Sequence, residues 1–251
     1  MNRTGETLRN NFGSEMIITT YNGSLNIDVY FPEYNWTAEH RAYVEFKKGT
    51  LRCPYEPRVY GVGYVGEGEY NATENGRSTR VYDTWHDMLR RCYDPKSLKK
   101  YRTYIGCEVC EEWHNFQNFA SWYDENYYEI CGERMVLDKD ILTKGNKVYS
   151  PETCCFVSNS INLLFTKRNT SRGELPIGVC FDKRRNKYKS QCNIGTGKTK
   201  FLGNYNTKEE AFNAYKQFKE ALIKKVANDY LELIPFNLYQ AMIDYEVDID
   251  D

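Results

Sequence analysis

The sequence predicts an α+β fold in which two antiparallel β units flank a helical middle region. Residues 16–48 contain short runs of β-branched and aromatic residues, which favour strands. Residues 83–122 carry large apolar side chains three and four positions apart, the spacing of an amphipathic helix. Residues 178–231 show three short strand patterns followed by one helix pattern. We therefore expect a β domain at 1–60, a Gly-rich linker at 61–76, a middle domain at 77–170, a C-terminal domain at 171–235 and an acidic tail at 236–251.

The N-terminal domain is predicted to be a small antiparallel sheet. Its strands are expected at 16–21, 27–31 and 43–46, and Asn22-Gly23 supplies a turn between the first two. Prolines and glycines crowd residues 54–76, which indicates a connector made of turns. The glycine spacing at 61–66 is similar to a dinucleotide-binding fingerprint, but no amphipathic helix follows at once, so the linker interpretation is preferred.

The middle domain is predicted to begin with two helices. The first has Asp83 as its N-cap and an apolar stripe formed by Trp85, Met88, Leu89 and Cys92. The second starts near Glu111 and repeats an aromatic residue at positions 113, 116, 119 and 122, which we interpret as core packing. A strand, a polar loop, a strand and a helix follow over residues 135–165.

The C-terminal domain is predicted to be a three-stranded meander packed on one helix. Turns at Arg185-Asn186 and at 195–197 separate the strands. Thr207 and Glu210 form a capping box that starts a helix ending near Leu231.

Composition excludes some classes of protein and points to a polyanion as partner. The chain has 251 residues and a net charge of −1, with no apolar run long enough to span a membrane and a polar N-terminus, so we expect a cytoplasmic protein. Nine cysteines in a reducing compartment predict free thiols. Residues 167–200 carry ten basic and two acidic side chains, a net of +8, whereas 243–251 carry five acids and no base. Such a basic segment favours nucleic acid, and a merely solvated face is the alternative.

The C-terminal pattern resembles the AP2 DNA-binding domain. The shared residues are Gly178-Val, Lys187-Tyr, Gly197-Lys, Phe201-Leu-Gly-Asn-Tyr, Thr207-Lys-Glu-Glu-Ala-Phe and Tyr215. The resemblance implies that the sheet lies in the major groove of double-stranded DNA, and alternate strand positions together with the first turn offer the contacts. The expected DNA-binding residues are Arg184, Arg185, Lys187, Lys189, Gln191, Lys198 and Lys200. The alternative is a small αβ module whose basic face is coincidental.

The middle domain resembles the HNH nuclease domain of phage homing endonucleases. The similar segments are Tyr82-Asp-Thr-Trp, Arg91-Cys-Tyr, Val109-Cys-Glu-Glu-Trp, Leu137-Asp-Lys-Asp, Gly145-Asn-Lys, Tyr149-Ser-Pro-Glu-Thr-Cys and Asn162. The family implies a ββα site with Mg²⁺ or another divalent cation and a histidine as general base. It places Asp138 and Asn162 as metal ligands, but Lys139 stands where the histidine belongs.

Lys139 predicts a degenerate nuclease centre. A lysine with an ordinary pKa of about 10.4 is protonated at neutral pH, so it neither accepts a proton from water nor helps to hold a cation. The three histidines, His40, His86 and His114, lie outside the strand, loop and helix of this centre. Asp138, Asp140 and Asn146 form either a cation cluster or ordinary loop caps.

A structural zinc site is the remaining metal hypothesis. Cys107 and Cys110 have the spacing of a ligand pair, with His114 nearby, and Cys92 and Cys131 are the other candidate ligands. Buried free thiols are the alternative interpretation.

These patterns favour one function and leave two alternatives open. The leading hypothesis is a phage or mobile-element DNA-binding protein of the HNH/AP2 homing-endonuclease type, cytoplasmic in an infected or lysogenic bacterial host, with a degenerate nuclease centre. The first alternative is a phage-encoded inhibitor that contacts a protein of a bacterial defence system. The second is an active metal-dependent DNA nickase, which would be an HNH endonuclease. No membrane partner is expected, and the sequence does not give the oligomeric state.

Overall fold

The computed structural model describes residues 2–166, 175–195 and 198–250, and it confirms a mixed α+β fold. The chain forms two compact units, Met1–Asp124 and Glu125–Asp251. An antiparallel sheet opens the first unit, and a three-stranded antiparallel sheet with a long helix lies in the second. No described helix combines the length and the apolar character needed to cross a membrane.

The N-terminal sheet has four antiparallel strands in the order β1-β2-β3-β4. They span Thr7–Arg9, Glu15–Tyr21, Ile27–Phe31 and Trp36–Arg41, and a 3₁₀ turn, η1 (Pro32–Tyr34), joins the last two. Met16 and Ile18 of β2 alternate into the core with Ile27 and Val29 of β3, which is the pattern of a sheet buried on one face.

The strand predicted at 43–46 is wrong, because these residues form the helix α1 (Tyr43–Lys47). Ala42 donates its backbone N–H to the Glu45 carboxylate at 3.1 Å, which favours a helical turn at this point. Phe46 is fully buried from this helix, so its apolar side chain fills the core without belonging to a strand.

Helices and short strands complete the first unit. The elements are β5 (Thr73–Glu74), β6 (Arg77–Ser78), α2 (Arg80–Tyr93), α3 (Pro95–Lys100), η2 (Arg102–Tyr104), β7 (Glu108–Val109), η3 (Glu111–His114) and α4 (Phe116–Asn126). Thr79 is the N-cap of α2, because its hydroxyl accepts from the N–H of Tyr82, so the cap predicted at Asp83 is wrong. The helix predicted from Glu111 is broken at Asn115, whose side chain accepts from the N–H of Gln117 and starts α4 afresh.

Aromatic side chains make the core between α2 and α4, as the spacing predicts. Trp85, Trp113, Phe116 and Phe119 are fully buried. The Trp85 indole donates to the Trp113 carbonyl at 2.7 Å, so the polar edge of this buried ring is satisfied.

The second unit follows the expected order of strand, loop, strand and helix, with a short additional strand, β9, between the two longer strands. The elements are β8 (Met135–Asp138), β9 (Val148–Tyr149), β10 (Cys155–Ser158) and α5 (Asn159–Phe165). β8 and β10 pair antiparallel, with Asp138 opposite Cys155. Ser158 caps α5 by accepting from the N–H of Ile161.

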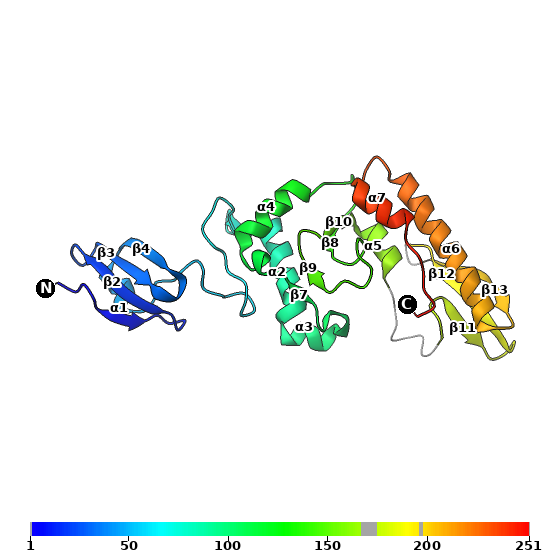
Figure 1. Ribbon diagram of the computed structural model, residues 1–251, viewed down its shortest axis with the longest axis horizontal. Coiled ribbons are helices and arrows are strands. Elements are labelled where there is room, and N and C mark those ends of the chain that lie inside the picture. The colour runs from blue at the N-terminus through cyan, green and yellow to red at the C-terminus, as the bar shows by residue number, and fades with distance from the viewer. Residues whose placement is uncertain (1, 167–174, 196–197, 251) are drawn as a thin grey trace. The chain divides into compact units, whose positions relative to one another are not determined.

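The C-terminal module consists of β11 (Val179–Asp182), β12 (Lys187–Asn193), β13 (Thr199–Tyr205) and α6 (Lys208–Asp229), followed by α7 (Phe236–Ile243). The strands lie side by side in chain order, and α6 covers one face of the sheet (Figure 1). The predicted capping box is present at the start of α6, formed by Thr207 and Glu210.

The acidic end of the chain packs against α6 over part of its length. Val247 is 2% exposed and belongs to the core of the C-terminal module. Its N–H donates to the Glu220 carboxylate at 2.9 Å, and its carbonyl accepts from the Lys216 ammonium at 2.7 Å. The segment predicted as an acidic tail is therefore helical at 236–243 and partly buried beyond it.

Candidate nucleic-acid interface

The two faces of the C-terminal sheet differ in chemistry. Val179, Ser190 and Cys192 are buried on the face that packs against α6. Because side chains alternate along a strand, the residues between them point to the opposite face. We call this opposite side the outer face; its central residues are Lys187, Lys189, Gln191 and Asn193 of β12.

Three of the predicted DNA-binding residues, Lys187, Lys189 and Gln191, share the outer face. In the strand register, Lys187 lies opposite Asp182 of β11, and Lys189 lies between Cys180 of β11 and Asn204 of β13. The Lys187 ammonium also donates to the Asn206 side chain. This placement puts two cations and one amide on a solvent-accessible sheet surface.

Arg184 and Arg185 lie in the exposed turn between β11 and β12. Asp182 organises this turn, since its Oδ1 accepts from the N–H groups of Arg184 at 3.0 Å and Arg185 at 3.2 Å. The Arg185 guanidinium also lies 3.0 Å from Asp182 Oδ2. The backbone hydrogen bonds and this ion pair hold the pKa of Asp182 below its usual value. The Arg184 guanidinium forms no ion pair within the described ranges, so its charge is available to a partner.

Lys198 and Lys200 are placed differently from each other. Lys198 is exposed in the turn before β13, where its N–H donates to the Gly195 carbonyl and its own carbonyl accepts from Ile194. Lys200 lies opposite Cys192, a residue of the inner face, and its ammonium is 4.9 Å from the ring centroid of Phe218 on α6. The structure therefore does not bring Lys200 to the outer face with the other predicted contacts.

Phe201 and Asn204 are outer-face residues that the sequence reasoning missed as contacts. Phe201 pairs with Gln191 and is 54% exposed, and the Lys189 ammonium lies 5.8 Å from its ring centroid. A β-bulge opposite Ser190 and Gln191 places an extra residue in β13 and brings Asn204 opposite Lys189. The glycine at position 203, which has φ +142° in the structure, is a residue type that often marks a bulge within a strand.

The three basic residues Lys167, Arg168 and Arg172 and the acidic Glu174, counted in the basic segment, lie outside the described residues. Gly197 of the AP2-like pattern also lies outside them.

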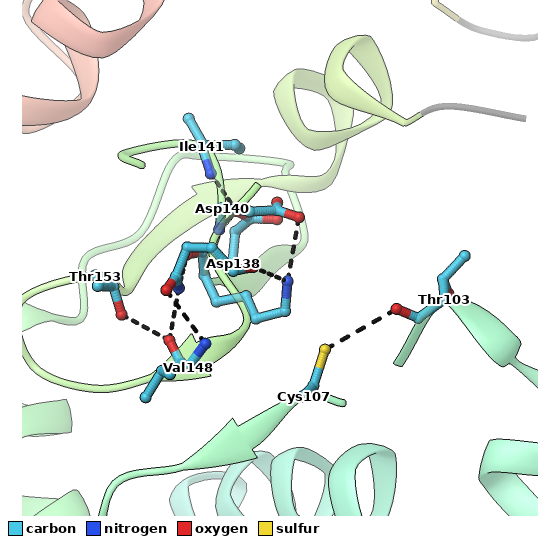
Figure 2. Close-up of polar contacts among 9 residues, drawn as sticks. Thr103, Cys107, Asp138, Asp140, Ile141, Val148 and Thr153 are labelled. Carbon is cyan, nitrogen blue, oxygen red and sulfur yellow. Dashed lines mark hydrogen bonds and ion pairs between the residues drawn. The ribbon is translucent and has the colours of Figure 1, made fainter. Parts of the chain in front are cut away.

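The centre expected from the HNH resemblance lies around Asp138 at the end of β8. Its Oδ1 accepts from the N–H groups of Asp140 and Ile141, each at 2.9 Å (Figure 2). Burial, reinforced by the nearby Asp140 carboxylate, raises the pKa of Asp138 to about 6. The arrangement is that of a carboxylate capping a tight loop.

Lys139 is a structural residue of this loop. Its side chain is 9% exposed, and its ammonium lies 3.2 Å from Asp140 Oδ2 and 2.9 Å from the Asn146 carbonyl. The Asn146 amide donates in turn to the carbonyls of Lys139 at 2.7 Å and Val148 at 2.6 Å. Lys139 and Asn146 thus tie the two ends of the loop together.

The polar side chains of this centre are engaged in contacts within the loop. Asp138 Oδ1 accepts from two backbone N–H groups, and the Lys139 ammonium lies 3.2 Å from Asp140 Oδ2, so a divalent cation at Asp140 would meet a neighbouring positive charge. None of the hydrogen bonds between described residues joins the Asn162 side chain of α5 to Asp138. Asp140 and Asn146 act as loop partners, which is the second of the two interpretations left open.

None of the four cysteines proposed as zinc ligands is in a disulfide, and they differ in burial and in their place along the chain. Cys92 and Cys107 are buried, and Cys110 is partly buried in the first unit. The Cys107 thiol lies 3.9 Å from the Thr103 carbonyl (Figure 2). Cys131 is exposed and belongs to the second unit. Over the ranges that the structure describes, no three or more His, Cys, Asp or Glu side chains gather as a metal site.

Comparison with known proteins adds no relative: no protein-family model matches this chain, and no match was found among curated proteins or solved structures. The functional argument therefore depends on the geometry alone.

Proposed function

We propose that this chain binds double-stranded DNA through the outer face of its C-terminal sheet. The observation that carries the proposal is that Lys187, Lys189 and Gln191 lie partly exposed on one face of β12, whose other face is buried under α6. A β-ribbon fits the major groove of B-DNA, in which lysines contact phosphates and Gln pairs with an adenine edge.

The turns at the two ends of β12 extend this basic surface. Arg184 is held in the β11–β12 turn, where its guanidinium forms no ion pair with another described residue, and Lys198 is exposed in the β12–β13 turn. Phosphates on the two sides of a groove need cations at separated positions, and these turns supply them. Phe201 adds an exposed ring for contact with a thymine methyl group.

We propose further that the protein is of the HNH/AP2 homing-endonuclease type and that it binds without cleaving. Support comes from the loop 138–148, in which Lys139 makes structural bonds and Asp138 caps backbone N–H groups. A protonated lysine in the place of the base leaves water without a proton acceptor.

Salt-dependent DNA affinity tests the binding proposal. The logarithm of affinity for duplex DNA should fall linearly with the logarithm of salt concentration, and the variant Lys187→Ala/Lys189→Ala should reduce that slope by roughly 2. Lys224→Ala, which removes an exposed lysine of α6, is the matched control and should change nothing. No measurable affinity at low salt, or an equal loss in both variants, would remove the proposal.

Incubation with supercoiled plasmid tests the absence of cleavage. No nicked product should form with Mg²⁺, Mn²⁺ or Ni²⁺. Nicking that disappears in Asp138→Ala would instead restore the active nuclease.

A further inference from the structure

A pocket in the first unit carries a second inference, independent of the C-terminal sheet. Its volume is about 520 Å³, within the roughly 300–1,000 Å³ typical of small-molecule sites. Its polar and aromatic lining consists of Arg52, Arg58, Tyr60, Tyr64, Tyr82 and His86. We call these six residues the Arg–Tyr pocket. No carboxylate is among the described residues that line it.

The two arginines have no acidic partner within the described part of the chain. Arg58 is exposed, and Arg52 has its guanidinium stacked over the Phe12 ring at 3.5 Å. This stacking positions the planar group and leaves its N–H donors, which lie in the guanidinium plane, open to an anion. A guanidinium group can bind a phosphate through two parallel N–H donors, and two such groups without an acidic partner among the described residues line this pocket.

Aromatic rings, which a simple anion site would not need, also line the pocket. The centroid of the His86 ring lies 5.1 Å from that of Tyr60 and 6.1 Å from that of Tyr82. The Tyr82 ring also packs against Trp85 and Phe116, with centroid distances of 5.5 Å and 5.4 Å, so its position is fixed before any ligand binds. Such rings accept the flat face of a nucleobase, and stacking of this kind tolerates any base.

Tyr60 has a backbone conformation that tyrosine rarely adopts. It has φ +53° and precedes Gly61 at φ +79°, in a two-residue turn closed by hydrogen bonds from Val62 and Gly63 to the Val59 carbonyl. Turns with two left-handed residues ordinarily take Asn, Asp or Gly at the first position. The tyrosine at this position places its ring in the pocket against His86, and an unusual backbone conformation at a pocket residue indicates a role for the ring.

We propose that the Arg–Tyr pocket binds a nucleoside phosphate, with the base against Tyr60 and Tyr82 and the phosphate on Arg52 and Arg58. The ligand is either a free mononucleotide or an unpaired nucleotide of a DNA strand, since the two present the same base and phosphate. The proposal goes beyond duplex binding by the sheet, and neither depends on the other.

Titration of the full-length protein with thymidine monophosphate tests the pocket. Thymidine and inorganic phosphate, titrated separately, should each bind at least ten-fold more weakly than the nucleotide, because each offers half of the contacts. Arg58→Gln should weaken nucleotide binding at least ten-fold. Arg77→Gln, which changes an exposed arginine of the same unit outside the pocket, is the matched control.

Tyr60→Asn isolates the role of the ring without endangering the turn. Asparagine tolerates the left-handed conformation, so the fold should be kept while stacking is lost. Nucleotide binding should fall and the melting temperature should not. Unchanged nucleotide affinity in both Arg58→Gln and Tyr60→Asn would overturn the proposal, as would phosphate binding as tightly as the nucleotide.

A competition experiment distinguishes the two sources of ligand. It uses the Lys187→Ala/Lys189→Ala variant, so that the sheet contributes little, and a short 5′-phosphorylated single strand of thymidines. Displacement of thymidine monophosphate by a lower concentration of the strand, lost in Arg58→Gln, would identify DNA. Displacement only at a higher concentration would identify the free nucleotide. No binding of either at millimolar concentration would refute the pocket while leaving the sheet proposal standing.

Discussion

Replacing Asp138 by asparagine should stabilise the second unit relative to the wild type, and this gain in stability should be larger at neutral pH than at acid pH. The pKa of Asp138 is raised from 3.8 to about 6 in the folded chain by burial. A carboxyl with a raised folded pKa contributes stability that is fully present below pH ~4 and is lost as pH rises through about 6. At pH 7 the buried charge therefore costs on the order of 3 kcal/mol relative to the protonated form.

The asparagine side chain keeps the loop caps and removes the charge. Its Oδ1 can still accept from Asp140 and Ile141, the two hydrogen bonds of the wild type. The difference in unfolding free energy between Asp138→Asn and wild type should thus grow from pH 4 to pH 7 by up to about 3 kcal/mol. Asp244→Asn, an exposed carboxylate of the same unit, should show no such trend.

The assay must report on the second unit specifically. All four tryptophans, at positions 36, 85, 113 and 122, belong to the first unit, so their fluorescence does not report on β8. Hydrogen exchange of peptides covering residues 135–141, measured by mass spectrometry in denaturant at several pH values, gives the local free energy. A difference that stays constant with pH would refute the reasoning, and protection of wild type by Mg²⁺ that Asp138→Asn abolishes would point to a cation ligand instead.

Three further predictions follow from single contacts. Gly178→Ala should destabilise the C-terminal module by roughly 2 kcal/mol, because φ is +79° and a Cβ would lie 2.0 Å from Tyr215; an unchanged thermal midpoint would contradict this. Lys139→Met should cost about 1–3 kcal/mol in chemical denaturation, since the loop carbonyl and Asp140 lose their donor, without altering DNA affinity. Lys189→Ala should weaken binding to duplex DNA several-fold in a fluorescence-anisotropy titration. Lys200→Ala should change the affinity less than two-fold, because the Lys200 ammonium lies over the Phe218 ring. Equal losses would mean that Lys200 also reaches the DNA.

The C-terminal module was predictable because its local signals agree with one another. Thr207 and Glu210 mark the start of α6, and the buried stripe of that helix contains Phe212 and Tyr215 at the expected spacing. Strand alternation also placed Lys187, Lys189 and Gln191 on a common face. Each of these features depends on residues fewer than about ten positions apart.

Features that depend on distant contacts were not predictable. Residues 43–46 have strand propensity, yet they form α1, because in this helix Phe46 packs into the core made by β2 and β3. The position of Lys200 depends on its register opposite Cys192, and simple counting along β13 does not reveal the bulge at Leu202 and Gly203. Burial of Val247 depends on Lys216 and Glu220, about thirty residues earlier.

The contacts of Lys139 bear on whether the proposed DNA binding needs a cleavage centre. The sequence marks it as a missing base, but the structure gives its ammonium two partners, Asp140 and the Asn146 carbonyl, in a loop that leaves little of the side chain exposed. A buried ammonium is tolerated because it is paired. Lys139→His would therefore remove a structural cation and leave those partners unsatisfied. The outer-face residues of β12 make none of these bonds. The loop can therefore keep its fold without a catalytic role, and the DNA binding proposed for the sheet does not require cleavage by this loop.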